Sequence, residues 1–239
     1  MRPFVKGNWP IMNGVKVGFV KHGDAKPYLE ENTGHYCHFC EMPLQNVPAV
    51  EHIKHQINHP NLVCHWDNLL LICTYCNSRK TKSKIKTYNY YWPHQHNTFY
   101  VFDYEILNIM SRGIPAISTR LTDPVLKIKA ERTINLYGLH QTTNSSGGID
   151  RRLSFRLIAI SQALECKKEY DANPRQITEQ AILRTARAAG FWSVWFTIFQ
   201  NDSAVLTELL QFQGTHVASF DTATYNPIPR NPTNIDDPI

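Results

Sequence analysis

Two stretches of sequence, 37-CHFC-40 and 73-CTYC-76, decide the fold that this chain is predicted to adopt. Each is a Cys-x-x-Cys turn, which can present two thiolates to one metal ion. Together, Cys37, Cys40, Cys73 and Cys76 predict a closed structural zinc site that stabilises a small fold directly. A redox role for one pair would leave the other pair unexplained. We expect His38, which lies between two of these ligands, at the surface or beside the site rather than as a fifth ligand.

The segment between the two pairs is longer than the loop of an ordinary zinc ribbon, and it carries polar residues of a particular kind. It holds Glu51-His52 and then Asn68, and Asn77 follows directly after the second pair. A carboxylate, an imidazole and amide oxygens are what metal-assisted hydrolysis of a phosphodiester bond needs. Taken singly, these residues have plain explanations as an edge residue, a core histidine, a turn residue and a helix cap. Their order, framed by two zinc half-sites, favours the joint catalytic role.

The apolar pattern places these polar residues on two strands and a helix. Residues 47–53 suit a strand, and residues 68–73, with the run Leu-Leu-Leu-Ile, suit a buried second strand. Residues 76–86 suit a short basic helix. We therefore predict an α+β chain built around a strand, strand, helix core.

Outside this core, composition and periodicity give a coarse outline. We expect three parts, which are an N-terminal extension at 1–34, the metal-bearing core at 35–95, and a mainly α-helical region at 96–239 with an extended tail. Helical spacing and Gly or Pro stop signals predict helices at 121–137, 153–164, 177–189 and 205–210. In the extension we expect a short hairpin at about 15–20 and a helical turn at 28–32. The string FWSVWFTIF at 191–199 is apolar nearly all round, so it should be buried in the chain's own core or against a partner.

Basic residues follow Asn77 directly and aromatic residues come next. They are Arg79, Lys80, Lys82, Lys84 and Lys86, and then Tyr88, Tyr90, Tyr91 and Trp92. Cations near phosphate and rings that stack on bases are the parts of a nucleic-acid groove. We assign Arg79, Lys80, Lys82 and Lys84 to nucleic-acid binding, with a solvated helix face as the plain alternative. The aromatic residues stay open between base stacking and a cluster that anchors the core.

The composition agrees with a folded protein that binds a polyanion. The 239 residues are 42% hydrophobic, enough for a buried core, and the net charge is +5. The first residues, MRPFVKGNWP, lack the apolar stretch of a secretory signal, and the apolar string 191–199 is too short to span a bilayer. We therefore expect a cytoplasmic protein with no membrane partner, in which Cys64 and Cys166 are buried or partly buried thiols.

The sequence around these positions resembles the HNH endonuclease superfamily, in VEHIKHQ (50–56), WDNLLLIC (66–73) and CTYCNSRK (73–80). A wider set of strings resembles the PtuB-type HNH nucleases of Septu anti-phage systems, including those attached to retrons. These strings are MRPF, GHYCHFCE, AVEHI, ERTINLYGL and GFWSVWFTIF. The resemblance covers most of the chain and implies a zinc-stapled ββα-metal core.

The resemblance also implies a role for each polar residue of the core. His52 corresponds to the general base, which takes a proton from the attacking water while a backbone carbonyl holds its other nitrogen. Glu51 and Asn77 correspond to the ligands of a catalytic Mg²⁺ or Mn²⁺. Asn68 corresponds to the residue that braces the loop and orients the histidine. The structural metal would be Zn²⁺.

Two features depart from the family pattern. Many members have Asp where this chain has Glu51, and the longer side chain would shift the metal. Where the branch usually has Pro-Lys, this chain has His55-Gln56, which removes one cation near the phosphate. His55, with His59 and His65 nearby, is a candidate to replace that contact. A second histidine near the base also leaves open metal-independent cleavage of RNA.

The leading interpretation is a metal-dependent nuclease, with DNA as the expected substrate and an RNA such as tRNA as the alternative. The resemblance implies an ABC-type or SMC-like ATPase partner, PtuA, and in retron-linked systems a reverse transcriptase with its RNA–DNA product. The chain has no G-x-x-x-x-G-K-[ST] motif, so control by ATP would come from outside. Two other classes remain, which are a zinc-dependent module that binds nucleic acid without cutting it and a subunit in which zinc only holds an interaction surface.

Overall fold

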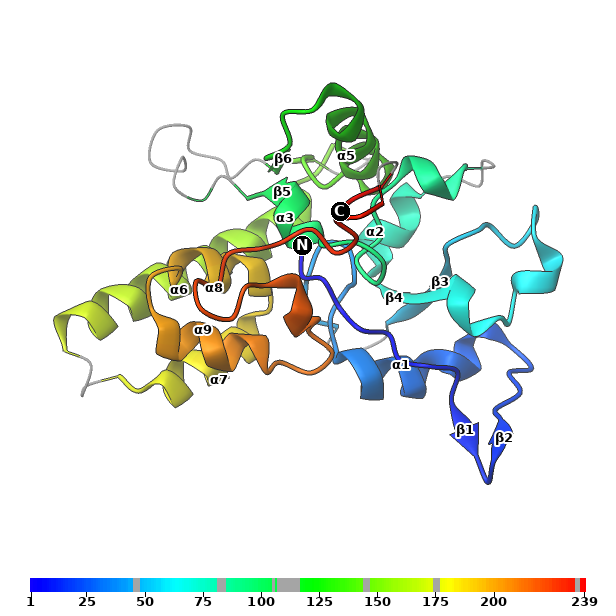
Figure 1. Cartoon of the computed structure of the whole chain (residues 1–239), viewed down its shortest axis with the longest axis horizontal. Coiled ribbons are helices and arrows are strands. Elements are labelled where there is room, and N and C mark those ends of the chain that lie inside the picture. Colours follow the sequence, from blue (N-terminus) through cyan, green and yellow to red (C-terminus); the bar gives the residue numbers. More distant parts are fainter. Residues whose placement is uncertain are drawn as a thin grey trace.

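The computed structural model describes residues 1–44, 48–80, 85–104, 106, 117–143, 147–173, 177–234 and 237–239. Within these ranges the chain is a mixed α/β protein, as predicted, with small two-stranded sheets and helices that dominate the C-terminal half (Figure 1). The helices are α1 (Lys26–Thr33), α2 (Thr74–Arg79), α3 (Thr98–Val101), α5 (Pro124–Tyr137), α6 (Arg151–Ala172), α7 (Glu179–Ala189), α8 (Trp192–Ile198) and α9 (Ser203–Leu210).

All three sheets of the described residues are antiparallel pairs. The pairs are β1 (Ile11–Met12) with β2 (Val15–Lys16), β3 (Ala49–His52) with β4 (Leu69–Ile72), and β5 (Phe102–Asp103) with β6 (Ser118–Thr119). Short 3-10 helices lie between the other elements or after the last of them, at η1 (His22–Ala25), η2 (Pro60–Leu62), η3 (Trp66–Asn68), η4 (Thr87–Asn89) and η6 (Val217–Ser219).

The β3–β4 hairpin and helix α2 form the predicted strand, strand, helix order. The strands pair with Glu51 opposite Leu70 and His52 opposite Leu69. Strand β4 is buried along its whole length, whereas β3 alternates between half-buried and buried residues. This alternation is expected for a strand that packs one face on the core. Cys73 caps α2, because its Sγ accepts a hydrogen bond from the Cys76 N–H at 3.4 Å.

The ends of these elements differ from the predicted ones. The first strand begins at Ala49, and Val47 lies outside the described residues. The basic helix is shorter than the expected 76–86, since it spans Thr74–Arg79 and Lys80 already has an extended conformation. The Cys73 cap starts this helix earlier than the basic pattern suggested.

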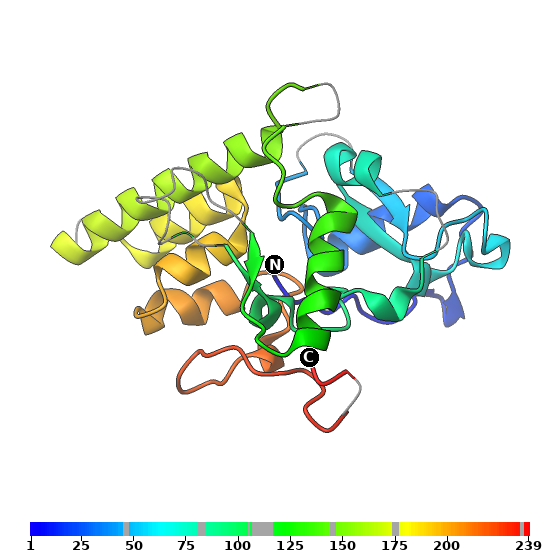
Figure 2. The ribbon, with the colours of Figure 1, turned by 90° about the horizontal axis from the view of Figure 1, so that it is seen from above.

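The predicted C-terminal helices are present as α5, α6, α7 and α9, with shifted ends. Asp123 caps α5 by accepting hydrogen bonds from two backbone N–H groups, and Gly138 ends it with a φ of 56°. The apolar string 191–199 forms α8, and nearly all of its residues are buried in the chain's own core. Figure 2 shows α5 between helices α6–α9 and the part of the chain that carries β3, β4 and α2.

The N-terminal hairpin lies earlier in the chain than expected. The predicted position was about 15–20, but β1 and β2 pair across Asn13-Gly14, which have φ angles of 52° and 79°. Asn-Gly suits such a turn because both residues tolerate positive φ. The hairpin projects from the molecule in Figure 1. The predicted turn at 28–32 is part of α1.

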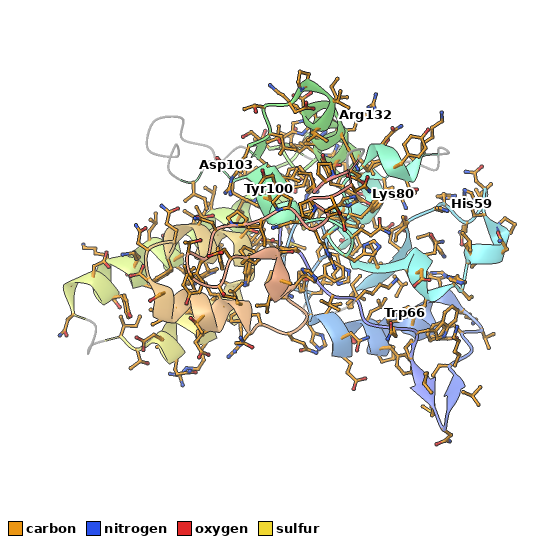
Figure 3. The ribbon with its side chains drawn as sticks, in the orientation of Figure 1. His59, Trp66, Lys80, Tyr100, Asp103 and Arg132 are labelled. Atoms are coloured by element: carbon orange, nitrogen blue, oxygen red, sulfur yellow. The ribbon has the colours of Figure 1, made fainter. Side chains whose placement is uncertain are left out.

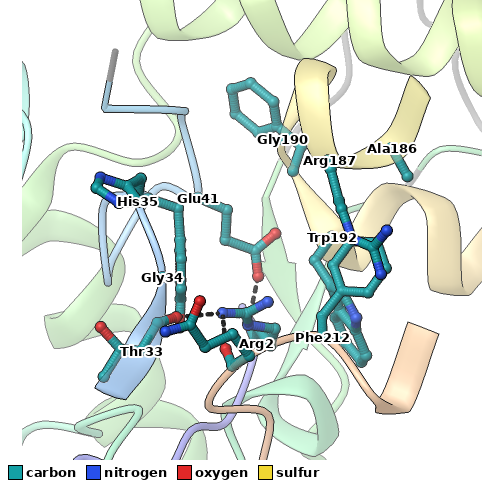
Figure 4. A pocket seen from close by; sticks show the side chains of 13 residues that line it. Arg2, Thr33, Gly34, His35, Glu41, Ala186, Arg187, Gly190, Trp192 and Phe212 are labelled. Carbon is teal, nitrogen blue, oxygen red and sulfur yellow. Dashed lines mark hydrogen bonds between the residues drawn. The ribbon is translucent and has the colours of Figure 1, made fainter. Parts of the chain in front are cut away.

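Three strings far apart in the sequence meet at the carboxylate of Glu41 (Figure 4). Glu41 is 1% exposed, and it accepts hydrogen bonds from the Arg2 N–H and from the N–H and hydroxyl of Ser193, the latter two at 3.0 and 2.7 Å. The Arg2 guanidinium donates to the carbonyls of Thr33 and Gln213 at 2.9 and 3.0 Å. A cavity of about 280 Å³ lies beside this junction. Residues of all three predicted parts of the chain therefore meet here, from the strings MRPF, GHYCHFCE and GFWSVWFTIF. The boundaries between those parts stay a prediction.

None of the described helices combines the length and the apolar composition that crossing a bilayer requires.

Candidate metal centre and catalytic site

The four predicted zinc ligands come together. Cys37, Cys40, Cys73 and Cys76 are buried, and their sulfur atoms all lie within 4.8 Å of one another. The Cys40 and Cys73 sulfurs are 3.6 Å apart. That distance is far above the S–S bond of about 2.05 Å, and it is close to the edge of about 3.8 Å for a tetrahedron with Zn–S bonds of about 2.3 Å. The cluster could hold a metal such as zinc.

A buried arginine from the helical region contacts this cluster. Arg152, at the start of α6, donates from Nη1 to the Cys76 sulfur at 3.2 Å and to the Tyr137 carbonyl at 2.7 Å. Its Nη2 donates to the Gly138 carbonyl at 2.9 Å and to the Asp150 carboxylate at 2.6 Å. A guanidinium beside a thiolate stabilises the charged form of the sulfur. Sequence reasoning missed Arg152, since no spacing relates it to the cysteines.

Residues between the first two ligands hold the cluster in the core. The Phe39 ring stacks on Tyr137 of α5, with ring centroids 3.7 Å apart. His38 is fully buried: its Nδ1 accepts from the Leu71 N–H at 3.2 Å, and its Nε2 lies 2.9 Å from the Thr33 hydroxyl. Burial lowers the pKa of His38 to about 3. Of the two expected positions for His38, the surface is excluded and the buried position beside the cysteine ligands is found, because its two ring nitrogens bond to β4 and α1.

His52 lies at the end of β3 with one ring nitrogen fixed by the backbone. It is 5% exposed, and its Nε2 lies 2.9 Å from the Val63 carbonyl. Because a carbonyl only accepts, Nε2 carries the proton, and Nδ1 keeps a lone pair. Burial lowers the pKa of His52 below its usual range, although the hydrogen bond to Val63 opposes this shift. A neutral imidazole with a defined lone pair has the chemistry of a general base.

Glu51, next to His52, forms an ion pair with Lys80. The Lys80 Nζ lies 2.7 Å from Glu51 Oε1, and the two side chains are 2% and 15% exposed. Burial lowers the pKa of Lys80, while the Glu51 carboxylate opposes that shift. The prediction that Lys80 reaches out to nucleic acid needs correction, because the chain leaves α2 and turns this side chain back onto β3. In Figure 3, Lys80 lies toward the middle of the molecule and His59 on the outer loop after β3.

Asn68 joins the two ends of the loop between β3 and β4. Its Oδ1 accepts from the Lys54 N–H at 2.7 Å, and its Nδ2 donates to the carbonyls of Lys54 and Leu62 at 3.1 and 3.0 Å. Leu62 directly precedes Val63, whose carbonyl holds His52. Asn68 therefore positions the backbone that orients the histidine.

The other predicted site residues are more open. Asn77 is exposed on α2, one turn after the Cys73 cap. Arg79 donates to a loop carbonyl at 2.8 Å, and the Nδ1 of His55 accepts from a backbone N–H two residues later. Lys82 and Lys84 lie outside the described residues.

The aromatic cluster divides between core and surface. Tyr91 is fully buried and Trp92 is 2% exposed, so these two rings anchor the core. Tyr88, in contrast, is 67% exposed and has the Lys86 ammonium 6.0 Å from its ring centroid. Of this group, Tyr88 is the ring that points outward with a cation beside it.

A histidine that sequence reasoning missed lies beside His52. The ring of His22, in η1, has its centroid 4.8 Å from that of His52, with the two planes at 58°. His22 belongs to the predicted extension and to none of the motifs of the core. No signal in the sequence links the two positions.

The residues present fit both kinds of metal ion in their chemistry. Four thiolates suit zinc. The Glu51 carboxylate and the Asn77 amide oxygen are hard ligands, which suit Mg²⁺ or Mn²⁺. Within the described residues, Lys80 pairs with one Glu51 oxygen, and the second oxygen accepts no hydrogen bond. One Glu51 oxygen is therefore neutralised by Lys80, so a metal ion at this carboxylate would use the other oxygen or compete with Lys80.

Comparisons of this chain with protein-family models, with curated proteins and with solved structures gave no significant match.

Proposed function

We propose that this chain is a metal-dependent nuclease of the HNH type, which hydrolyses phosphodiester bonds of nucleic acid. The observation that carries the proposal is the arrangement of His52, with Nε2 held by the Val63 carbonyl and Glu51 adjacent on the same strand. The four-cysteine cluster and the order of β3, β4 and α2 support it, as does the resemblance of the core motifs.

The chain's own groups suggest how cleavage would proceed. His52 takes the proton of the attacking water at Nδ1, and the Val63 carbonyl stabilises the resulting imidazolium at Nε2. Glu51 and Asn77 would hold Mg²⁺ or Mn²⁺, which supplies positive charge to the phosphate and the leaving oxygen when bound. Asn68 keeps the loop, and thereby the base, in place before substrate arrives.

The biological setting in this proposal comes from the resemblance. It makes the chain an effector of anti-phage defence, regulated by a PtuA-like ATPase. A retron reverse transcriptase and its RNA–DNA product would join in retron-linked systems. DNA is the proposed substrate and tRNA the alternative.

The test is cleavage of plasmid DNA and total tRNA by the purified chain in Mg²⁺, with and without the product of the neighbouring gene. His52→Ala should remove cleavage while the zinc content and the folded state are retained, because His52 is not one of the cysteine ligands and its ring bonds to a single loop carbonyl, that of Val63. A His52→Ala variant that cuts at the wild-type rate would refute the proposal. The substrate that is cut names the substrate class.

One observation favours a second function, which is a zinc-dependent module that binds nucleic acid without cutting it. The Lys80 ammonium already neutralises Glu51 within a mostly buried ion pair. If that pair persists, the carboxylate cannot serve a metal fully. In this case the purified chain would bind DNA or RNA equally well in Mg²⁺ and in EDTA and would cut neither, with or without the partner.

A further inference from the structure

The proposed catalytic histidine has a second histidine as its neighbour, supplied by the N-terminal extension. The ring centroids of His22 and His52 are 4.8 Å apart, so any substrate that reaches Nδ1 of His52 also comes close to His22. His22 is half-buried, and within the described residues its ring nitrogens have no hydrogen-bond partner. A ring N–H of His22 is therefore available to a ligand.

The position of His22 is fixed by local structure. The Asp24 carboxylate accepts hydrogen bonds from the N–H groups of Val20 and Lys21 at 3.0 and 2.9 Å, which closes the turn around His22. Ala25, the last residue of η1, is fully buried. The turn therefore holds His22 without using its side chain.

The extension is also attached to the loop that orients His52. The Cys64 thiol lies 3.5 Å from the Val20 carbonyl, and the Trp9 ring packs edge-on against His65 with centroids 4.8 Å apart. Both contacts involve the loop that contains Val63, the partner of His52. The segment that carries His22 and the loop that holds His52 are therefore in direct contact.

Because Lys80 is paired with Glu51, it is not free to donate to a substrate phosphate, and His22 can supply such a donor. Hydrogen-bond donors on the non-bridging oxygens of a scissile phosphate stabilise the charge that develops there, in addition to a bound metal ion. Lys80, the basic residue nearest to Glu51, is already paired and only 2% exposed on its side chain. The Nε2–H of His52 is likewise taken by the Val63 carbonyl.

We propose that His22 is a substrate-binding residue of the nuclease site, whose ring N–H donates to a non-bridging oxygen of the scissile phosphate while His52 acts as the base. The inference rests on the proposed function and extends the site into the N-terminal extension. No covalent step passes through His22. Its contribution is a directed hydrogen bond to an anionic oxygen.

The experiment compares steady-state cleavage by His22→Ala, His22→Phe, His22→Asn and His22→Gln, with His140→Ala as the control at an exposed histidine. A hydrogen bond to a charged group is worth enough that kcat/KM should fall about 10- to 100-fold in His22→Ala. His22→Phe keeps the ring packing but has no donor, so it should be as defective as His22→Ala. Asn and Gln place an N–H near Nδ1 and Nε2 respectively, so one of them should restore most of the loss.

Binding to the uncleaved substrate gives a second readout. In the inactive His52→Ala background, adding His22→Ala should weaken the affinity for a labelled oligonucleotide of the cleaved type, measured by fluorescence anisotropy. Adding His140→Ala should not. The urea unfolding midpoint of each variant verifies that the fold is intact.

The outcomes separate the two proposals. If His52→Ala cuts like the wild type, the proposed function itself fails. If His52→Ala is inactive but His22→Ala or His22→Phe keeps kcat/KM and affinity within twofold of the wild type, only the role of His22 is overturned. A normal His22→Phe beside a defective His22→Ala would mean that the ring merely packs against His52, which also overturns it.

Discussion

Arg152→Met should destabilise the protein and its cysteine cluster together. The guanidinium is 3% exposed on its side chain and pairs with Asp150, which is 1% exposed, while also donating to two carbonyls and to the Cys76 sulfur. Removing one partner of a buried ion pair leaves the other charge unpaired and costs about 3–5 kcal/mol. A whole domain is stable by about 5–15 kcal/mol, so the loss is a large share of the total.

The magnitude converts directly into a measurement. With a urea m-value of about 3 kcal/mol/M, the unfolding midpoint followed by tryptophan fluorescence should fall by about 1–2 M. A chromogenic zinc chelator should detect metal release over the same urea range, because Arg152 touches a cluster sulfur.

A double variant supplies the control for this reasoning. Asp150→Asn combined with Arg152→Met removes both charges, while Asn retains the helix-capping acceptor that Asp150 offers to the Arg152 N–H. We expect the double variant to regain at least about 1 kcal/mol over Arg152→Met alone. A single variant whose midpoint and zinc release match those of the wild type would refute the role given to this pair.

Three further predictions concern the metal, the backbone and the pH. Cys73→Ser should lower zinc content and soluble yield, whereas Cys64→Ser should change neither; equal zinc content by metal analysis would contradict the site. Gly190→Ala should lower the free energy of unfolding in urea by about 2–4 kcal/mol, because φ is 70° and a Cβ would lie 2.6 Å from a proline ring. Gly18→Ala is the control and should be nearly neutral, since a Cβ there meets nothing within 4 Å. Equal urea midpoints for the two variants would contradict this reasoning. Burial lowers the pKa of Lys6 to about 7, so between that value and its unfolded pKa the unfolded chain binds the extra proton and stability rises with pH. The stability of the wild type relative to Lys6→Met should therefore grow by about 2 kcal/mol between pH 7 and pH 9, and a flat difference would contradict it.

Local signals in the sequence were sufficient for the elements and for the cysteine cluster. Each Cys-x-x-Cys turn presents two sulfurs by its own geometry, so a common site for all four cysteines could be predicted without knowledge of the rest of the fold. The run Leu69–Ile72 could be assigned to a buried strand because all of its residues are apolar. Element ends were less predictable, since they depend on caps such as that of Cys73.

The partners of individual polar side chains could not be predicted in the same way. Lys80 follows a basic pattern that favours solvent, yet it turns inward because Glu51 lies on the strand that the chain meets after α2. His38 was expected either at the surface or beside the metal site, and the hydrogen bond that its Nδ1 accepts from the Leu71 N–H of β4 fixes the buried position. In both cases the deciding neighbour is far away along the chain.

By itself, the sequence determined that this chain contains a four-cysteine cluster, a strand, strand, helix core and a helical C-terminal half, because each is indicated by short local motifs such as a Cys-x-x-Cys turn or an apolar run. Only the tertiary structure decided which side chains share a site. It placed Arg152 on the cluster, Ser193 on Glu41 and His22 beside His52. The physical reason is that such contacts form between elements whose packing is set by the whole buried core, and no local pattern records that packing.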